Sequence, residues 1–274
     1  MAADLLSLVS ESGCHLGSGC GFPAPDASIF AFDDVWGMDI FGLHIGINKP
    51  IILLICAAVA LMAFFVYAFR KPQLVPRGAQ GLGEIGYSFI RDGIARDTIG
   101  KEGDRFVPLM FTSFFLIWLL NVLGIIPFLQ IPVTATFAIP VAFALIIYLT
   151  WVPLGIRRQG FGPFMKSMTM PPDVPKAMYV LLIPIEILSN FIVRPFTHSV
   201  RLFANMYAGH MLITTFSVGA WYLLSPSVIG IIGSTGSFVT AIGLTLFEVL
   251  IQFLQAYVFT LLIAVYLNDA VHGH

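Results

Sequence analysis

Two stretches of this 274-residue sequence carry polar side chains at helical spacing within otherwise apolar segments. Steps of three and four relate six polar residues of the first stretch, which places them on one face of a helix: Asn190, Arg194, Thr197, His198, Arg201 and Asn205. In the second stretch the same steps connect Thr245, Glu248, Gln252 and Gln255. We expect two antiparallel helices whose polar faces meet in a buried seam.

Arg201 is the charge in these stretches that is hardest to explain as structural. Within a lipid bilayer an arginine costs at least about 2.5–3.5 kcal/mol, so it usually lines a pathway or meets a partner. No acidic residue lies within a helical turn of Arg201 in the sequence. For Asn190, Thr197 and Thr245, hydrogen bonding between helices is the favoured interpretation.

His210 and Glu248 are candidates for proton transfer. His210 follows Arg201 by nine residues, about 180° around an ideal helix, so it points away from the arginine face. Imidazole titrates near neutral pH, and a carboxyl in apolar surroundings holds its proton more tightly than one in water. We expect the two side chains to pair across the helices toward the outer side. A purely structural hydrogen bond is the alternative.

The composition requires a membrane. Apolar residues make up 58% of the chain and charged residues 11%, against about 25% charged residues in soluble domains. Mean hydropathy is +0.90, and so few charges cannot cover the surface of a soluble protein of this size. The sequence thus excludes soluble enzymes, nucleic-acid-binding proteins and disordered chains. It also contains no Gly-x-x-x-x-Gly-Lys-Ser/Thr phosphate loop, so we expect no nucleotide site.

About five segments are expected to cross the bilayer, which predicts an all-α integral membrane protein. One crossing needs about 20 apolar residues, and the expected segments are 50–69, 107–127, 136–156, 177–218 and 237–268. The last two exceed one upright crossing, so we expect them to be long, tilted and antiparallel. Residues 1–49 form an N-terminal segment outside the membrane domain, which comprises residues 50–274.

Basic residues predict the orientation. Segments 70–105 and 157–176 hold eleven of the twelve lysines and arginines outside the membrane segments, and residues 1–49 hold one. Since basic loops stay in the cytoplasm, we expect the N-terminus outside and the C-terminus in the cytoplasm. Segment 70–105 is then a cytoplasmic amphipathic stretch that lies on the membrane or binds a partner; a solvated loop is the alternative. In the outer segment, Cys14 and Cys20 allow a disulfide, but two free thiols are favoured.

Three motifs in this chain resemble subunit a of the rotary F-type ATP synthases of bacteria. Residues 201–210, Arg-Leu-Phe-Ala-Asn-Met-Tyr-Ala-Gly-His, are similar to the family's arginine motif. Residues 255–259, Gln-Ala-Tyr-Val-Phe, are similar to its last helix, and residues 121–127, Asn-Val-Leu-Gly-Ile-Ile-Pro, to its Asn-x-x-Gly-x-x-Pro pattern. The resemblance spans about residues 45–270 in consistent order.

The resemblance implies a non-catalytic stator subunit of the bacterial plasma membrane. Two offset half-channels would lead protons to and from a rotating ring of c subunits, each of which carries one carboxylate within the membrane. By resemblance Arg201 is the essential charge between the half-channels, Gln255 faces it from the last helix, and Asn205 lies in the same region. The implied partners are the c-ring, a b-type peripheral stalk subunit, other ATP synthase subunits and lipid, with no cofactor, metal or nucleic acid.

The sequence departs from the family pattern at several positions of the expected proton path. Many members carry a glutamate where this chain has His210 and a histidine where it has Glu248, so the acid and the imidazole look exchanged between two helices. The family's glutamate upstream of the arginine is matched to Glu186, and Gln252 belongs to the same polar stripe as Glu248. The common Asp or Asn near residue 130 is missing, and Thr134 and Thr136 occur there instead.

Two functions other than a proton-conducting stator are the alternatives: a secondary transporter and a structural membrane scaffold. A secondary transporter would use it to bind an anionic substrate, but it predicts internal repeats, and none is convincing in this sequence. A structural scaffold predicts no lone cation within the membrane. A sodium-coupled version of the same subunit is a variant of the first interpretation, because the ring carboxylate's neighbours decide between the ions.

Overall fold

A computed structural model describes residues 22, 24–30, 34–40, 43–70, 73, 75–126, 131–170, 178–225 and 227–272 of the chain. Cys14, Cys20 and residues 127–130, where the second expected membrane segment ends, lie outside these residues. The chain divides into two compact units. The first comprises residues 1–57, 118–136 and 203–254, and the second comprises residues 58–117, 137–202 and 255–274.

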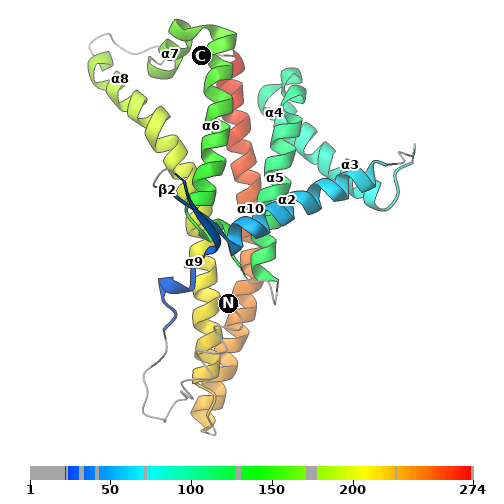
Figure 1. Cartoon of the computed structure of the whole chain (residues 1–274), viewed down its shortest axis with the longest axis vertical. Helices are drawn as coiled ribbons and strands as arrows, with labels where there is room; N and C mark the ends of the chain where they lie inside the picture. Colours follow the sequence, from blue (N-terminus) through cyan, green and yellow to red (C-terminus); the bar gives the residue numbers. More distant parts are fainter. Residues whose placement is uncertain are drawn as a thin grey trace. The chain divides into compact units, whose positions relative to one another are not determined.

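Five long apolar helical stretches dominate the structure (Figure 1), which confirms the all-α membrane fold. They are α2 (Lys49–Ala68), α5 (Val107–Ile125), α6 (Ala138–Gln159), a stretch from Tyr179 to Tyr222, and α10 (Val228–His272). The stretch from Tyr179 to Tyr222 comprises α8 (Tyr179–Leu188), η6 (Ser189–Val193) and α9 (Arg194–Tyr222). Helix α10 begins at Val228, before the expected residue 237, because the Ser- and Gly-rich residues 228–236 continue the helix instead of forming a turn.

A short β-hairpin lies in the first unit, in a segment for which the sequence predicted no regular structure. Strand β1 (Asp34–Ile40) pairs antiparallel with β2 (Leu43–Asn48), and the register matches Gly37 with Gly46. A 3₁₀ turn, η1 (Ala27–Phe30), precedes the hairpin. The available signal was a two-residue connection between two runs that contain β-branched residues.

A π-helical segment interrupts the fourth membrane stretch just before Pro195. In η6 the backbone N–H of Arg194 donates to the carbonyl of Ser189, five residues back. The carbonyl of Asn190 thereby loses its α-helical donor, and its π-helical donor would be Pro195, which has no N–H. The phenol of Tyr148 in α6 donates to this carbonyl instead. The interruption of the helix before Pro195 therefore takes the form of a π-segment supported from α6.

The polar segment after α2 is helical, which excludes a plain solvated loop. It contains α3 (Ala79–Ile90), the π-helix η2 (Arg91–Ala95), α4 (Arg96–Ile99) and η3 (Lys101–Arg105). Apolar side chains of α3 are exposed, among them Leu82 and Ile85, while Ile90 is buried. This helix therefore exposes apolar side chains on part of its surface.

Two arginines hold the end of this segment through one carboxylate. Arg91 and Arg96 each form two hydrogen bonds with Asp104, and the shortest ion-pair distances are 3.0 and 2.8 Å. These guanidinium donors hold the pKa of the Asp104 carboxyl well below its usual range. A planar carboxylate and a planar guanidinium fit each other in this two-bond geometry. The pairs thus connect η3 to η2 and α4.

Candidate functional site

His210 and Glu248 meet within the first unit, as their sequence positions predicted. His210 lies in α9 and Glu248 in α10, and Nδ1 of the imidazole is 3.1 Å from Oε1 of the carboxyl. Both side chains are buried, with exposed fractions of 9% and 6%. Among the described residues, the second carboxyl oxygen of Glu248 has no hydrogen-bond partner.

The second nitrogen of His210 settles where its protons lie. Nε2 is 2.9 Å from the backbone carbonyl of Gly124 in α5, and a carbonyl oxygen only accepts hydrogen bonds. Nε2 must therefore carry a hydrogen. The contact between Nδ1 and Oε1 then needs one more proton, held either by the imidazole or by the carboxyl. A hydrogen bond between these two adjacent atoms therefore contains one proton, bonded to either of them.

Two glycines allow the three helices to approach each other around this pair. A Cβ added at Gly209 in α9 would lie 2.8 Å from both Cδ and Oε1 of Glu248. A Cβ added at Gly124 in α5 would lie 2.4 Å from Cε of Met206 and 3.3 Å from Cε1 of His210. Both positions therefore require glycine, because any other residue would bring a Cβ into this space. In the sequence these glycines are visible only as parts of two motifs, which give no sign of their role in packing.

The first unit contains other buried polar residues besides His210 and Glu248. Gln252 is buried one turn after Glu248, and its Nε2 lies 3.7 Å from the sulfur of Met206. The hydroxyl of Thr134 donates to Oδ1 of Asn121 at 2.7 Å, both buried. Asn205 is exposed. Of the residues expected in the buried seam, Glu248, Gln252 and Gln255 of the α10 stripe and Asn190 and His198 of the other stripe are buried, whereas Asn205 is exposed.

Arg201 lies in the second unit and is exposed, in contrast to the buried position that the sequence suggested. No carboxylate of the described residues lies within 4.0 Å of its guanidinium. An arginine in a membrane helix that has no acid of its own chain nearby is left to meet water or another molecule. Gln255 of the same unit is buried in α10.

Glu186 contacts Asn190 and not Arg201, although a proton path was expected to connect Glu186 with the region of Arg201. The amide nitrogen of Asn190 donates to Glu186 at 3.2 Å and to the carbonyl of Met168 at 2.7 Å. Asn190 is buried, and Glu186 is partly exposed. The structure therefore places Glu186 in a cluster of the second unit, beside the π-segment, and gives it no contact with Arg201.

A second arginine of α9 does have an acid of its own chain. Nη1 of Arg194 is 3.6 Å from Oδ2 of Asp269 in the last turn of α10, and its Cζ lies 5.7 Å from the ring centroid of Tyr266. Sequence reasoning noted Arg194 but missed Asp269, because 75 residues separate them and no local pattern connects them. Both residues belong to the second unit.

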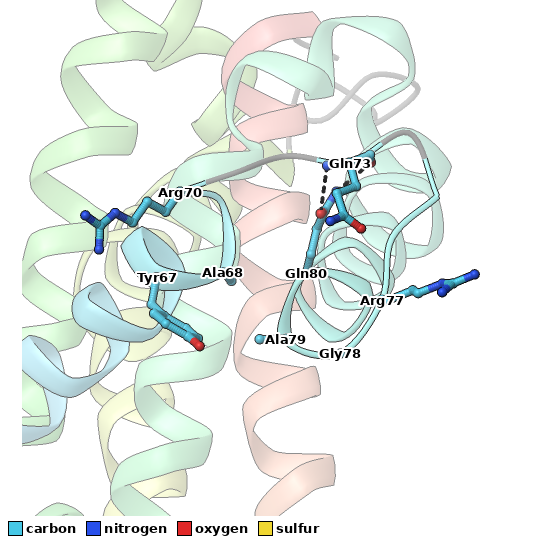
Figure 2. A pocket seen from close by; sticks show the side chains of 8 residues that line it. All are labelled: Tyr67, Ala68, Arg70, Gln73, Arg77, Gly78, Ala79 and Gln80. Carbon is cyan, nitrogen blue, oxygen red and sulfur yellow. Dashed lines mark hydrogen bonds between the residues drawn. The ribbon is translucent and has the colours of Figure 1, made fainter.

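The second unit also contains a pocket at the end of α2. It has a volume of about 650 Å³ and is lined by Tyr67, Ala68, Arg70, Gln73, Arg77, Gly78, Ala79 and Gln80. Figure 2 shows Arg70 and Arg77 extending away from each other, while Gln73 and Gln80 are joined by hydrogen bonds. None of the predicted site residues lines this pocket.

Known proteins similar to this chain share one description. The family model of the ATP synthase A chain matches residues 51–268. A relative from Streptomyces lividans is 44% identical over 97% of this chain and 94% of its own length. Relatives from Frankia alni (41% identical, 92% and 88% covered) and Rhodococcus erythropolis (41%, 84% and 86%) are similar to it as well. All three are named ATP synthase subunit a.

These relatives are bacterial, and five helical stretches of the chain are long and apolar enough to cross a membrane. The chain is thus a multi-pass protein of the bacterial plasma membrane. The family match over most of the sequence, together with identities above 40% along nearly the full length, shows that the chain belongs to the ATP synthase A chain family.

Proposed function

We propose that the chain is the proton-conducting stator subunit of an F-type ATP synthase. Its two half-channels load and unload the carboxylates of a rotating c-ring, and Arg201 separates them. The observation that carries this proposal is the exposed guanidinium of Arg201, which has no carboxylate within 4.0 Å among the described residues. Its counter-ion is then supplied by the ring.

The chemistry of the ring explains why such a cation is needed. A carboxyl that faces lipid keeps its proton, because desolvation disfavours the charged form. At about 4 Å and an effective dielectric constant of about 20, a guanidinium favours the ionised carboxylate by about 4 kcal/mol. Arginine suits this position because it stays charged and does not itself carry protons between the half-channels. Protons then cross the membrane only on the moving ring.

The buried polar residues take the remaining roles in this proposal. His210 and Glu248 form the proton relay of the outer half-channel, supported by their 3.1 Å contact and their burial. Gln252 lines the same route along α10, while Asn205 and Gln255 are assigned to the region where the ring carboxylate meets Arg201. Glu186, with Asn190, is assigned to the inner half-channel.

The proposed partners and orientation follow from the same assignment. The c-ring supplies the carboxylate that meets Arg201, and a b-type stalk subunit holds the stator against rotation. The N-terminus lies outside and the C-terminus in the cytoplasm, an orientation supported by the basic residues of segments 70–105 and 157–176. The chain has no catalytic role of its own in ATP chemistry.

The test is the substitution Arg201→Lys in the assembled ATP synthase, in inverted membrane vesicles. Lysine keeps the charge but loses the planar two-bond geometry. We expect this variant to lose about 1.4 kcal/mol or more of the interaction with the ring carboxylate, which reduces ATP-driven proton pumping at least about tenfold. The matched control is Arg105→Lys, an exposed arginine of η3, which should pump normally.

Several results would contradict the proposal. Normal pumping by Arg201→Lys would remove Arg201 from its role. Anion uptake that needs this chain but no other synthase subunit would indicate a secondary transporter. Pumping that depends on sodium at fixed pH would replace the proton by sodium.

A further inference from the structure

We propose that Asp269 neutralises Arg194, so that Arg201 is the one cation of α9 that acts on the ring carboxylate. This inference rests on the function proposed above and adds a positioning residue to it. Arg194 and Arg201 are seven residues apart, which places them about 10 Å apart along nearly the same side of a helix. Without compensation, the helix would present two cations in succession.

The contacts of Arg194 provide this compensation within the chain. Its guanidinium lies 3.6 Å from the carboxylate of Asp269, and the exposed fractions of the two side chains are 36% and 10%. The ring of Tyr266 lies under the guanidinium at 5.7 Å, on the same face of α10 as Asp269. Two further titratable groups of the described residues lie in this region: Tyr148 of α6, and His198 of α9, whose ring centroid is 6.1 Å from that of Tyr266.

The position of Asp269 is unfavourable unless it has such a partner. It lies in the last turn of α10, where the helix dipole disfavours negative charge. An acid near the end of a membrane helix also needs a cation to offset its desolvation. The last turn is held in place by Gln159 of α6, whose Nε2 donates to the carbonyls of Asp269 and Ala270 at 2.9 Å each. The carboxylate is therefore anchored where it meets Arg194.

The consequence concerns the protons that use the inner half-channel. A unit positive charge at about 10 Å, with an effective dielectric constant of about 20, lowers the proton affinity of a carboxylate about tenfold. If Arg194 were not neutralised, its charge would add to that of Arg201 and make loading of the ring from the inside harder. Neutralisation by Asp269 removes the effect of Arg194 on the proton affinity of the ring carboxylate, while the effect of Arg201 remains.

The experiment compares Asp269→Asn with the double variant Asp269→Asn/Arg194→Gln in inverted vesicles. ATP-driven pumping is measured per assembled complex as a function of pH, with assembly quantified on native gels. Asp269→Asn should shift the pH profile of pumping about one pH unit toward acid, because loading from the inside now needs more protons. The double variant should return the profile to that of the wild type. Arg158→Gln, which removes an exposed contact with Glu102 at 3.9 Å, is the control and should not shift it.

A wild-type pH profile for Asp269→Asn would overturn the inference, as would a double variant that remains shifted. If Asp269→Asn does not assemble, the reversed pair Arg194→Asp/Asp269→Arg replaces it. Pumping with a wild-type profile by the reversed pair supports neutralisation, and an assembled but inactive complex contradicts it. The variant Arg201→Lys distinguishes failure of the proposed function from failure of this inference. If Arg201→Lys pumps normally, the proposed function fails. If Arg201→Lys is impaired but Asp269→Asn keeps the wild-type pH profile, this inference alone fails.

Discussion

At the scale of single residues, the contacts of His210 and Glu248 define what the pair can do. The 3.1 Å contact between Nδ1 and Oε1 holds one shared proton, and the Gly124 carbonyl fixes the hydrogen on Nε2. Burial excludes water from competing for these atoms. The chemistry therefore needs one imidazole and one carboxyl at these two positions.

The first prediction is that exchanging the two residues preserves part of the function. Glu248→Gln and His210→Ala should each slow passive proton flux roughly tenfold or more, because general acid–base groups contribute at least that much to proton transfer. The double exchange His210→Glu/Glu248→His keeps both groups and should conduct better than either single variant. The measurement is proton flux through vesicles stripped of the catalytic head.

A control for this experiment is available at the end of α10. His272→Ala removes an exposed histidine whose contact is with Asn268 at 2.9 Å, and its flux should equal that of the wild type. Unchanged flux in both single variants would give the pair a structural role only.

The sequence predicted this pair but not all of its surroundings. Residue spacing indicated that His210 points away from Arg201, and the polar stripe of α10 contained Glu248. The Gly124 carbonyl carries no side-chain signal, so sequence could not assign it. The exposure of Arg201 was also missed, because helical spacing shows which residues share a face but not what covers that face.

At the scale of elements, glycines determine how closely the helices of the first unit approach each other. Gly209 leaves no room for a methyl group beside Glu248, whereas Gly243 of α10 has no atom within 4 Å of its missing Cβ. The two glycines thus differ in packing although both lie within long helices. They provide a matched comparison.

We predict that Gly209→Ala destabilises the assembled protein and lowers proton flux, whereas Gly243→Ala does neither. The added methyl group at residue 209 forces the buried carboxyl to move, at a cost of about 1–3 kcal/mol. At residue 243 alanine only gains helix propensity, up to about 1 kcal/mol. Thermal denaturation in detergent and passive proton flux are the measurements. Equal stability of the two variants would contradict the close approach.

A second element-scale prediction concerns Asp104. The pKa of the Asp104 carboxyl is lowered in the folded protein. Its ion pairs therefore stabilise the segment fully when the pH is above the pKa of this carboxyl in the unfolded chain, and the stabilisation is lost as the pH falls toward the folded-state pKa. Asp104→Asn should therefore increase hydrogen exchange in residues 91–105 at pH 7. The difference in thermal stability between variant and wild type should stay constant from about pH 5 to 8 and shrink below about pH 4. A constant difference down to about pH 2 would contradict the role of these pairs.

The helices were easier to predict than their irregularities. Runs of about 20 apolar residues identify membrane helices by length alone. The start of α10 at Val228 was missed because glycine and serine favour turns in soluble proteins but are common in membrane helices. The π-segment η6 depends on a tyrosine of another helix, and residues so far apart in sequence give no local signal.

At the scale of the whole molecule, the chain places apolar side chains outside and many of its polar side chains inside. Leu246, Phe247 and Leu250 of α10 are exposed, whereas Glu248 and Gln252 on the same helix are buried. Composition alone predicted the membrane, and three short motifs predicted the family. The structure was needed to show which arginine of α9 has an acid of its own chain nearby, because Arg194 and Asp269 are far apart in the sequence.

An imidazole conducts a proton across its ring only when one nitrogen takes up a proton while the other releases one. In this chain Nε2 of His210 is bound to the backbone carbonyl oxygen of Gly124, which is too weak a base to receive that proton. We therefore expect His210 to take up and release its mobile proton through Nδ1 alone, with the carboxyl of Glu248 as the group on the other side of each transfer.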